Sequence, residues 1–199
     1  MQPAYYENLV EIQKKLWAML DDAVVNRSSP FRIPVFICAD ENNIDGRIVV
    51  LRKSDKSNSI LQFHTDFRSQ KVDILKKNDK ASLVFYDKEE KIQLRIKVNC
   101  EINNQNITTK EAWKKTQHIS RRCYLVDGGP GIISKVPTSG MISKLEDFDY
   151  TMEQSEKGYK NFTVIKCKIK SIEWLYLAAK GHRRAIFDFE KNENNWLVP

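Results

Sequence analysis

The sequence predicts a mainly β protein with peripheral helices, built as an antiparallel barrel or sandwich. Short apolar-rich segments recur about seven times along the chain, and turn residues separate them. The most regular segment alternates strictly between apolar and polar side chains. Hydrophobic residues make up 41% of the 199 residues and charged residues 30%, a composition typical of a globular protein with its own core.

An N-terminal helix is expected over residues 8–25, where Leu9, Ile12, Leu16 and Leu20 recur at helical spacing. Turn residues over 26–30 end it. Extended segments follow, and we expect strands over 31–38, 46–53 and 60–65, with a turn cluster at Asp40 to Gly46.

The next expected helix spans 66–78, and Ser69 is a suitable N-cap residue for it. Further strands are expected over 81–86, 91–102 and 161–172. In the middle one, Ile92, Leu94, Ile96 and Val98 alternate with Gln93, Arg95 and Lys97.

A third helix is expected over 108–118. Residues 127–143 are rich in Gly, Pro and Ser and predict a long loop, which in a compact domain is usually functional or mobile. Residues 174–189 predict a C-terminal hairpin. Because neither composition nor repeats divide the chain, residues 1–199 are expected to form a single domain.

The formal net charge of +7 leaves two interpretations open, an anionic partner or a lysine-rich solvated surface. Nucleic acid is not expected, because the row of Lys166, Lys168 and Lys170 has no interleaved aromatic side chains. No membrane span is expected, because no apolar run approaches the roughly 20 residues that one needs. The first ten residues contain Glu7 and lack a cationic flank, so no signal peptide is expected either.

The four cysteines do not show the spacing of metal ligands, and a reduced, cytoplasmic setting is therefore expected. Histidine occurs only at His64, His118 and His182, without an H-E-x-x-H pattern, so no metal site is expected. A G-x-S-x-G nucleophile elbow and the usual phosphate-binding glycine loops are also missing from the sequence.

Polar side chains gather at the expected strand ends. Arg47 and Arg52 bracket one apolar strand, His64-Thr65 ends the next, and Ser69-Gln70-Lys71 begins a helix. The free N–H groups of a helix start, its positive dipole and a nearby cation together favour a phosphate. Each residue alone also has a plain structural interpretation, as a helix cap, a solvated lysine or an edge charge.

These segments, taken in order, resemble the pyridoxamine 5′-phosphate oxidase family. The resemblance rests on Arg47-Ile48-Val49-Val50-Leu51-Arg52, Phe63-His64-Thr65, Ser69-Gln70-Lys71 and Ile92-Gln93-Leu94-Arg95. Near the C-terminus, Trp174 is followed by Lys180-Gly181-His182-Arg183-Arg184, where the family has a Trp and then R-L-H-D-R. Trp196-Leu197-Val198-Pro199 resembles a shortened form of the family's C-terminal motif W-x-x-x-x-L-x-P.

The resemblance implies an FMN-binding split β-barrel, usually a homodimer with FMN at the subunit interface. It implies FMN contacts from a set of residues spread over the chain: Arg47, Ile48, Val49, Val50, Leu51, Arg52, His64, Thr65, Ser69, Gln70, Lys71, Gln93, Trp174 and Arg184. It also implies that Lys180 and His182 contact a small-molecule substrate. No catalytic residue is assigned. Trp174 is also a candidate core residue, and His182 a candidate exposed turn residue.

Arg47 and Arg52 are five residues apart, so on one regular strand they point to opposite faces. Either a bulge intervenes, or one of them contacts FMN through its backbone.

Three departures from the family pattern stand out. Arg52 replaces a lysine, and Gln70 replaces an arginine. In the family's substrate-phosphate segment, a Tyr, an Arg and a Ser correspond to Trp113, Gln117 and Arg121, and a glutamine cannot replace the cation that holds a phosphate. We therefore expect an FMN-dependent oxidoreductase with a changed substrate site. The alternative is a non-catalytic FMN-binding module.

Overall fold

The computed structural model describes residues 4–42 and 44–199. Its strands are β1 (Val35–Ala39), β2 (Ile44–Ile48), β3 (Leu51–Asp55), β4 (Ile60–Asp66), β5 (Lys80–Asp87), β6 (Ile92–Asn104), β7 (Phe162–Tyr176), β8 (Arg183–Asp188) and β9 (Glu193–Leu197). Its α-helices are α1 (Leu9–Val25), α2 (Gln70–Lys77), α3 (Ile107–Lys115), α4 (His118–Arg121), α5 (Ser143–Glu146) and α6 (Met152–Ser155). Four 3-10 turns complete it: η1 (Ala4–Glu7), η2 (Pro30–Arg32), η3 (Arg122–Tyr124) and η4 (Glu156–Asn161).

The sheet is antiparallel, in the order β2-β1-β5-β6-β7-β4-β3; β8 also pairs with β7, and β9 pairs with β8. The end strands β2 and β3 do not pair with each other in the described part of the chain, so the sheet is not closed. The expected class, mainly antiparallel β with peripheral helices, is confirmed.

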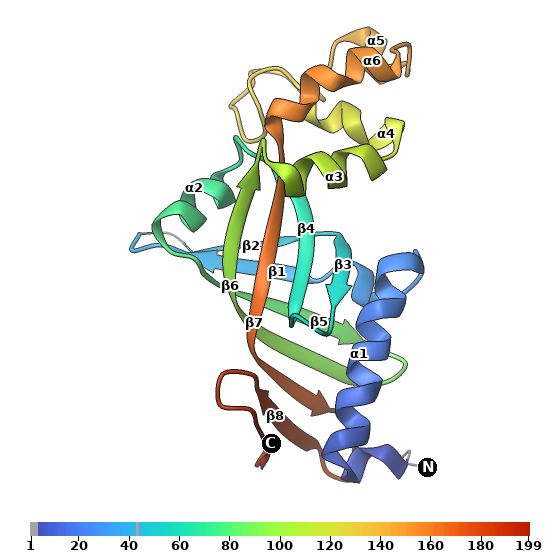
Figure 1. The fold of residues 1–199 in the computed structure, drawn as a ribbon, viewed down its shortest axis with the longest axis vertical. Coiled ribbons are helices and arrows are strands. Elements are labelled where there is room, and N and C mark those ends of the chain that lie inside the picture. Colours follow the sequence, from blue (N-terminus) through green and yellow to red (C-terminus); the bar gives the residue numbers. More distant parts are fainter. Residues whose placement is uncertain (1–3, 43) are drawn as a thin grey trace.

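β6 and β7 are the longest strands, and they run from the helical end of the molecule to the end where both termini lie (Figure 1). Their pairing extends from Asn104 opposite Thr163 to Ile92 opposite Tyr176, with one irregularity at Lys97/Val98. All residues between Asn104 and Phe162 form a helical cap at one end, which contains α3 to α6 (Figure 1).

α1 lies against the sheet and is amphipathic, as its spacing predicts. Asn8 caps it by accepting hydrogen bonds from the N–H groups of Val10 and Glu11, and Ile12, Leu16 and Leu20 are buried. They join a core that includes Phe36 and Phe63, and each such buried side chain contributes roughly 2 kcal/mol. A second, smaller cluster of Trp113, Phe162 and Val164 lies under the helical cap.

Two expected strands differ from the structure. The strand over 46–53 is wrong as a single element: β2 ends at Ile48 and β3 begins at Leu51. The strand over 161–172 and the first arm of the hairpin are one strand, β7. Residues 31–38 begin as the turn η2 because Pro30 occupies its first turn, and strand β1 starts only after Pro34. The described residues form nine strands where about seven were expected.

The N-terminal helix, the loop over 127–143 and the hairpin are confirmed to within a few residues. The expected turn at Asp40 to Gly46 includes residue 43, which is outside the described residues, and β2 already begins at Ile44. Residues 1–3, part of the stretch used to exclude a signal peptide, are also outside them. Among the described helices, none combines the length and hydropathy needed to cross a bilayer.

Candidate functional site

Thr65, Ser69 and Lys71 meet where β4 leads into α2. The Lys71 Nζ atom donates a hydrogen bond to Thr65 Oγ1 at 2.9 Å, and the Thr65 and Ser69 hydroxyl oxygens are 3.3 Å apart. All three side chains are buried. The structure therefore brings these three predicted residues into one cluster, which we call the Lys71 cluster.

The start of α2 is free to receive a ligand. The Ser69 hydroxyl donates to the Asp66 carbonyl oxygen at 2.7 Å, and no side chain of the described residues caps the helix at Ser69. The Asp66 carboxylate accepts instead from the backbone and guanidinium of Arg68. The first N–H groups of α2 and its positive dipole end therefore lie beside the Lys71 cluster without a side-chain acceptor, an arrangement that favours an anion.

Lys71 is a buried cation that lacks a counter-ion. Its residue is 8% exposed, and no carboxylate of the described residues lies within 4.0 Å of its Nζ atom. Burial, followed by repulsion from Arg47, lowers the pKa of Lys71 to about 8. A buried charge whose main contact is a neutral hydroxyl is unfavourable, and an anionic ligand would relieve it.

Arg47 and Arg52 lie on two different strands. Arg47 lies in β2, opposite the buried Phe36 of β1. It forms an ion pair with Asp45 and is close enough to Lys71 to lower the pKa of that lysine. The pairing of β3 with β4 shifts between Leu51 and Lys53, which places Arg52 at a bulge. The strand break and the bulge resolve the conflict over the faces of these two arginines, and Arg52 lies with His64 instead.

Residues 48–51, between Arg47 and Arg52, expose few side chains that a ligand could contact. Val49 and Leu51 belong to the core, at 8% and 2% exposure, whereas Ile48 is 64% exposed. Val50 is half-buried, and Gln70 is exposed at the start of α2.

A second group of predicted residues lies near the other end of β6 and β7. Gln93 is opposite Leu175, and Leu175 is opposite Arg184, so the three form a row across the sheet. The Arg184 guanidinium donates to Glu173 at 2.5 and 3.1 Å. Although burial opposes the change, hydrogen bonds from Arg184 and Arg95 hold the pKa of Glu173 below its usual value. The charge of Arg184 in this row is therefore already paired with Glu173 of the same chain.

Trp174 is in the core of this chain. It is 1% exposed, and its ring lies 5.6 Å from Tyr6 and 6.4 Å from Tyr176. Lys180 and His182 are exposed on the turn between β7 and β8, where Gly181 has a positive φ of 115°. His182 Nδ1 accepts a hydrogen bond from the Ala178 N–H at 3.0 Å, which fixes the turn.

The two groups do not meet within one chain. Thr65 pairs with Thr163, which is opposite Asn104 at the end of β6. Gln93 lies 104 − 93 = 11 residues back along the same strand, a path of about 35 Å at the rise of a β-strand.

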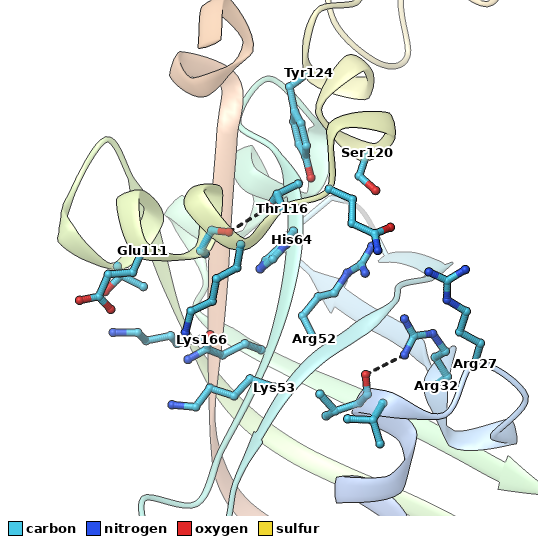
Figure 2. Close-up of a pocket in the computed structure, with 17 residues that line it drawn as sticks. Arg27, Arg32, Arg52, Lys53, His64, Glu111, Thr116, Ser120, Tyr124 and Lys166 are labelled. Atoms are coloured by element: carbon cyan, nitrogen blue, oxygen red, sulfur yellow. Dashed lines mark hydrogen bonds between the residues drawn. The ribbon is translucent and has the colours of Figure 1, made fainter. Parts of the chain in front are cut away.

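A cavity of about 690 Å³ lies between β3, β4, the end of α1 and the helical cap (Figure 2). Of the predicted residues, Arg52 and His64 line it, whereas Thr65, Ser69 and Lys71 are not in its lining. Burial, and then the charge of Arg52, lowers the pKa of His64 to about 4, so this imidazole is neutral at pH 7. Tyr124 and Ser120 contribute hydroxyl groups to the lining of this cavity (Figure 2), whereas the Thr116 hydroxyl donates to the Ala112 carbonyl oxygen at 2.9 Å.

Residues 15–104 match the sequence model of a family described as pyridoxamine 5′-phosphate oxidase, FMN-binding domain. Over this segment the chain is similar to the pyridoxamine 5′-phosphate oxidase family. The matched segment carries Arg47 to Arg52, the Lys71 cluster and Gln93, but not Trp174 or Arg184. FMN is the cofactor of the domain that these residues form.

Solved structures share the fold at low sequence identity. A pyridoxamine 5′-phosphate oxidase-related, FMN-binding protein from Nostoc punctiforme is 16% identical, with a TM-score of 0.70 and full coverage of both chains. PhzG from Burkholderia lata, solved with tetrahydrophenazine-1-carboxylic acid, is 15% identical, with a TM-score of 0.73 and coverage of 100% and 98%. General Stress Protein 26 from Bacillus anthracis is 11% identical, with a TM-score of 0.51 and coverage of 92% and 99%. No curated protein matches the chain by sequence.

The segment that corresponds to the substrate-phosphate residues of the pyridoxamine 5′-phosphate oxidase family is partly structural in this chain. Gln117 lines the cavity. Trp113 is buried in the small cluster under the cap, and Arg121 is 4% exposed. The Arg121 guanidinium donates to backbone oxygens of Trp113 and Thr116 and forms an ion pair with Glu156. Arg121 therefore joins the helices of the cap to one another.

Sequence reasoning missed most of the cavity. Its further cationic residues are Arg27, Arg32, Lys53, Lys115 and Lys166. They come from the connection after α1, the turn η2, β3, α3 and β7, so no local motif connects them. The only signal in the sequence was the net charge of +7, which does not say where the charges gather.

Proposed function

We propose that this protein is an FMN-dependent oxidoreductase that transfers a hydride between a small-molecule substrate and the flavin. The observation that carries the proposal is the buried, unpaired Lys71 beside two hydroxyl groups and a free helix start, inside an FMN-binding domain. This donor set fits a phosphate: one cation, two hydroxyls and backbone N–H groups.

The chain's own residues would divide the work of binding. Lys71, Thr65, Ser69 and the nearby Arg47 would hold the phosphate of FMN, with Gln70 at its edge. The backbone of 48–51 and the side chains of Arg52 and His64 would lie along the rest of the molecule. When bound, FMN supplies the redox chemistry, because its ring system accepts and releases a hydride. Arg52 and Arg184 are the cations that can stabilise negative charge on a reduced ring.

A homodimer with FMN at the interface is part of the proposal. The residues of the second group, Gln93, Trp174 and Arg184, are too far along β6 and β7 to reach the Lys71 cluster of the same chain. A partner chain would supply them, together with Lys180 and His182 for the substrate, and Trp174 would have to become exposed to take part. The outer face of the sheet supports pairing, because Val35 and Ile48 lie opposite each other there at 38% and 64% exposure.

The proposal also covers the organisation and location of the protein. Residues 1–199 would form one FMN-binding split-barrel domain. Its helices would pack on the single core or belong to the helical cap. A cytoplasmic location is proposed because the four cysteines are free, including Cys100 and Cys167, whose sulfur atoms are 3.8 Å apart.

A second candidate function is a non-catalytic FMN-binding module. Gln117 favours it, because this residue removes a cation from the substrate segment of the family. The similar protein from Nostoc punctiforme is described only as oxidase-related and FMN-binding.

The decisive experiment measures FMN binding and flavin reduction in turn. Purified protein is expected to be yellow, to release FMN on heating, and to gain thermal stability when FMN is added. Lys71→Met is expected to weaken FMN binding by about tenfold or more. Lys76→Met is the matched control, since Lys76 is an exposed lysine of the same helix and is paired with Asp73.

Anaerobic bleaching of the flavin by a candidate electron donor, NADH or pyridoxamine 5′-phosphate, separates the enzyme from the binding module. A colourless protein whose melting temperature does not respond to FMN would contradict both candidate functions.

A further inference from the structure

The cavity beside Arg52 carries a large excess of positive charge. Six cationic residues line it, namely Arg27, Arg32, Arg52, Lys53, Lys115 and Lys166, against one carboxylate, Glu111. His64 adds no charge at neutral pH. A singly charged ligand would leave most of this charge uncompensated, so the cavity fits a ligand with more than one acidic group.

Several of these cations have no partner in the protein. Within residues 4–42 and 44–199, no carboxylate lies within 4.0 Å of Arg27, Arg52 or Lys115. Arg32 donates to the backbone oxygens of Ala23 and Val24 at the end of α1. Lys53 is paired with Asp55 at 3.1 Å, and Lys166 is 3.9 Å from Glu101. Arg27, Arg52 and Lys115 are thus available to a ligand.

The cations form two poles. Arg27 and Arg32 reach the cavity from one side, Lys53 and Lys166 lie on the other, and Arg52 lies between them (Figure 2). Burial, followed by the charges of Arg32 and Arg27, lowers the pKa of Arg52, although Tyr124 opposes this. The hydroxyl groups of Ser120 and Tyr124 supply uncharged hydrogen-bond partners in the space between the poles, whereas the Thr116 hydroxyl already donates to the Ala112 carbonyl oxygen at 2.9 Å.

We propose that this cavity binds a small organic dianion whose two acidic groups, carboxylate or phosphate, engage the two cationic poles. Arg27, which belongs to one pole, and Lys115, at the end of α3, are its specificity-determining residues, because both line the cavity and neither has a carboxylate partner among the described residues. The volume of about 690 Å³ is typical of a site for a small organic molecule. The dianion's role as substrate rests on the proposed function, whereas its binding does not.

The test measures dianion binding to the FMN-saturated full chain by titration calorimetry at low ionic strength. The probes are the dicarboxylates succinate, glutarate and adipate, the phosphorylated carboxylate phosphoglycolate, and monocarboxylates of matched length. We expect the best dianion to bind about tenfold or more tightly than its matched monoanion, and to weaken as salt is added. Comparison of the dicarboxylates with phosphoglycolate shows whether a phosphate, which carries more negative charge, binds in place of one carboxylate.

Two variants and one control locate the site. Arg27→Gln and Lys115→Gln are each expected to weaken dianion binding by about tenfold, with FMN content unchanged. Lys110→Gln removes the same charge from the same helix, but Lys110 does not line the cavity, so a change of less than about twofold is expected. A melting temperature within experimental error of the wild type confirms that each variant is folded.

Equal affinity for dianions and monoanions would overturn the proposal, as would equal losses in Lys110→Gln and Lys115→Gln. In a parallel titration of the FMN-free chain, displacement of the dianion by added FMN would show that the flavin itself occupies the cavity, which also overturns the proposal. Dianion binding with the expected variant pattern in a chain that does not bind FMN would uphold this inference and contradict the proposed function. FMN binding without saturable dianion binding would contradict this inference and leave the proposed function standing.

Discussion

Lys71 and Arg184 lie beside opposite ends of the same strand, β7. Lys71 donates a hydrogen bond to Thr65, which pairs with Thr163 near the start of β7, whereas Arg184 pairs with Leu175 near its end. The two positions on β7 are 175 − 163 = 12 residues apart, or about 40 Å along an extended strand. A single FMN molecule cannot touch both residues of one chain, so they can share a ligand only across two chains.

Mixing of two variants tests this relationship. Lys71→Met and Arg184→Gln are each expected to lose FMN retention when expressed alone. In a two-fold dimer with composite sites, random mixing of the two variant chains restores about a quarter of the sites, because each mixed dimer holds one site with both native residues. Flavin absorbance per chain in the co-expressed mixture is the measurement.

The control for this mixing experiment is Lys71→Met co-expressed with a differently tagged Lys71→Met, which should stay colourless. Recovery of no flavin in mixed dimers that are shown to form would exclude a site shared between subunits.

The pH dependence of stability reports the buried charge of Lys71. Its pKa of about 8 in the folded chain lies below the ordinary value of 10.5, so between these two pH values the unfolded chain binds more protons. FMN-free protein is therefore expected to gain stability as the pH rises from 8 toward 10.5, by an amount on the order of 3 kcal/mol from this residue.

Lys71→Met should lack this contribution. The measurement is the difference between the urea-unfolding free energies of wild type and variant across this pH range, which removes the common titration of other groups. A constant difference would show that Lys71 is solvated or paired in solution.

His64 provides a second titration test, inside the cavity. Burial and the charge of Arg52 lower its pKa to about 4, so its ring signals in NMR should not shift between pH 7 and 5. Because the folded pKa lies below the ordinary value of 6.5, the contribution of His64 to stability rises with pH from about 4 to 6.5. Arg52→Gln should raise the pKa only modestly, since burial is the larger cause. Titration of the wild-type ring near its ordinary value would mean that the cavity is open to water.

Arg121 should matter for stability and not for binding. Its buried guanidinium bonds to Trp113, Thr116 and Ser155 and pairs with Glu156, so Arg121→Met leaves several buried acceptors unsatisfied. The expected loss of unfolding free energy is about 2–4 kcal/mol. FMN affinity of the remaining folded protein should be unchanged. A stable variant with weakened substrate or cofactor binding would instead place Arg121 in the site.

The sequence was informative where one element determines the structure. The helix over 8–25, the alternation from Ile92 to Val98 and the hairpin over 174–189 are local patterns, and the structure confirms each. The Lys71 cluster was also predictable, because Thr65, Ser69 and Lys71 lie within seven residues and a strand end followed by a helix start must bring them close.

The sequence was less informative where the structure depends on distant pairing. The spacing of Arg47 and Arg52 left a bulge open as one of two alternatives, but nothing near Arg52 locates the register shift of β3 against β4, since a bulge is set by the partner strand. Arg27, Lys115 and Lys166 converge only after the sheet has formed and the cap has folded over it. Trp174 has the spacing of a ligand residue but packs against Tyr6, more than 160 positions earlier, and no local pattern encodes that contact.

The helical cap is a single excursion of the chain, leaving the sheet after Asn104 and returning at Phe162. Thr108, Glu111, Gln117 and Tyr124 all belong to it, whereas the Lys71 cluster lies outside it. One contiguous stretch of coding sequence can therefore be exchanged or lengthened without disturbing the register of any strand pair. Such an arrangement allows the residues that line the cavity to vary independently of the Lys71 cluster, and it marks 105–161 as the segment to graft when engineering new selectivity.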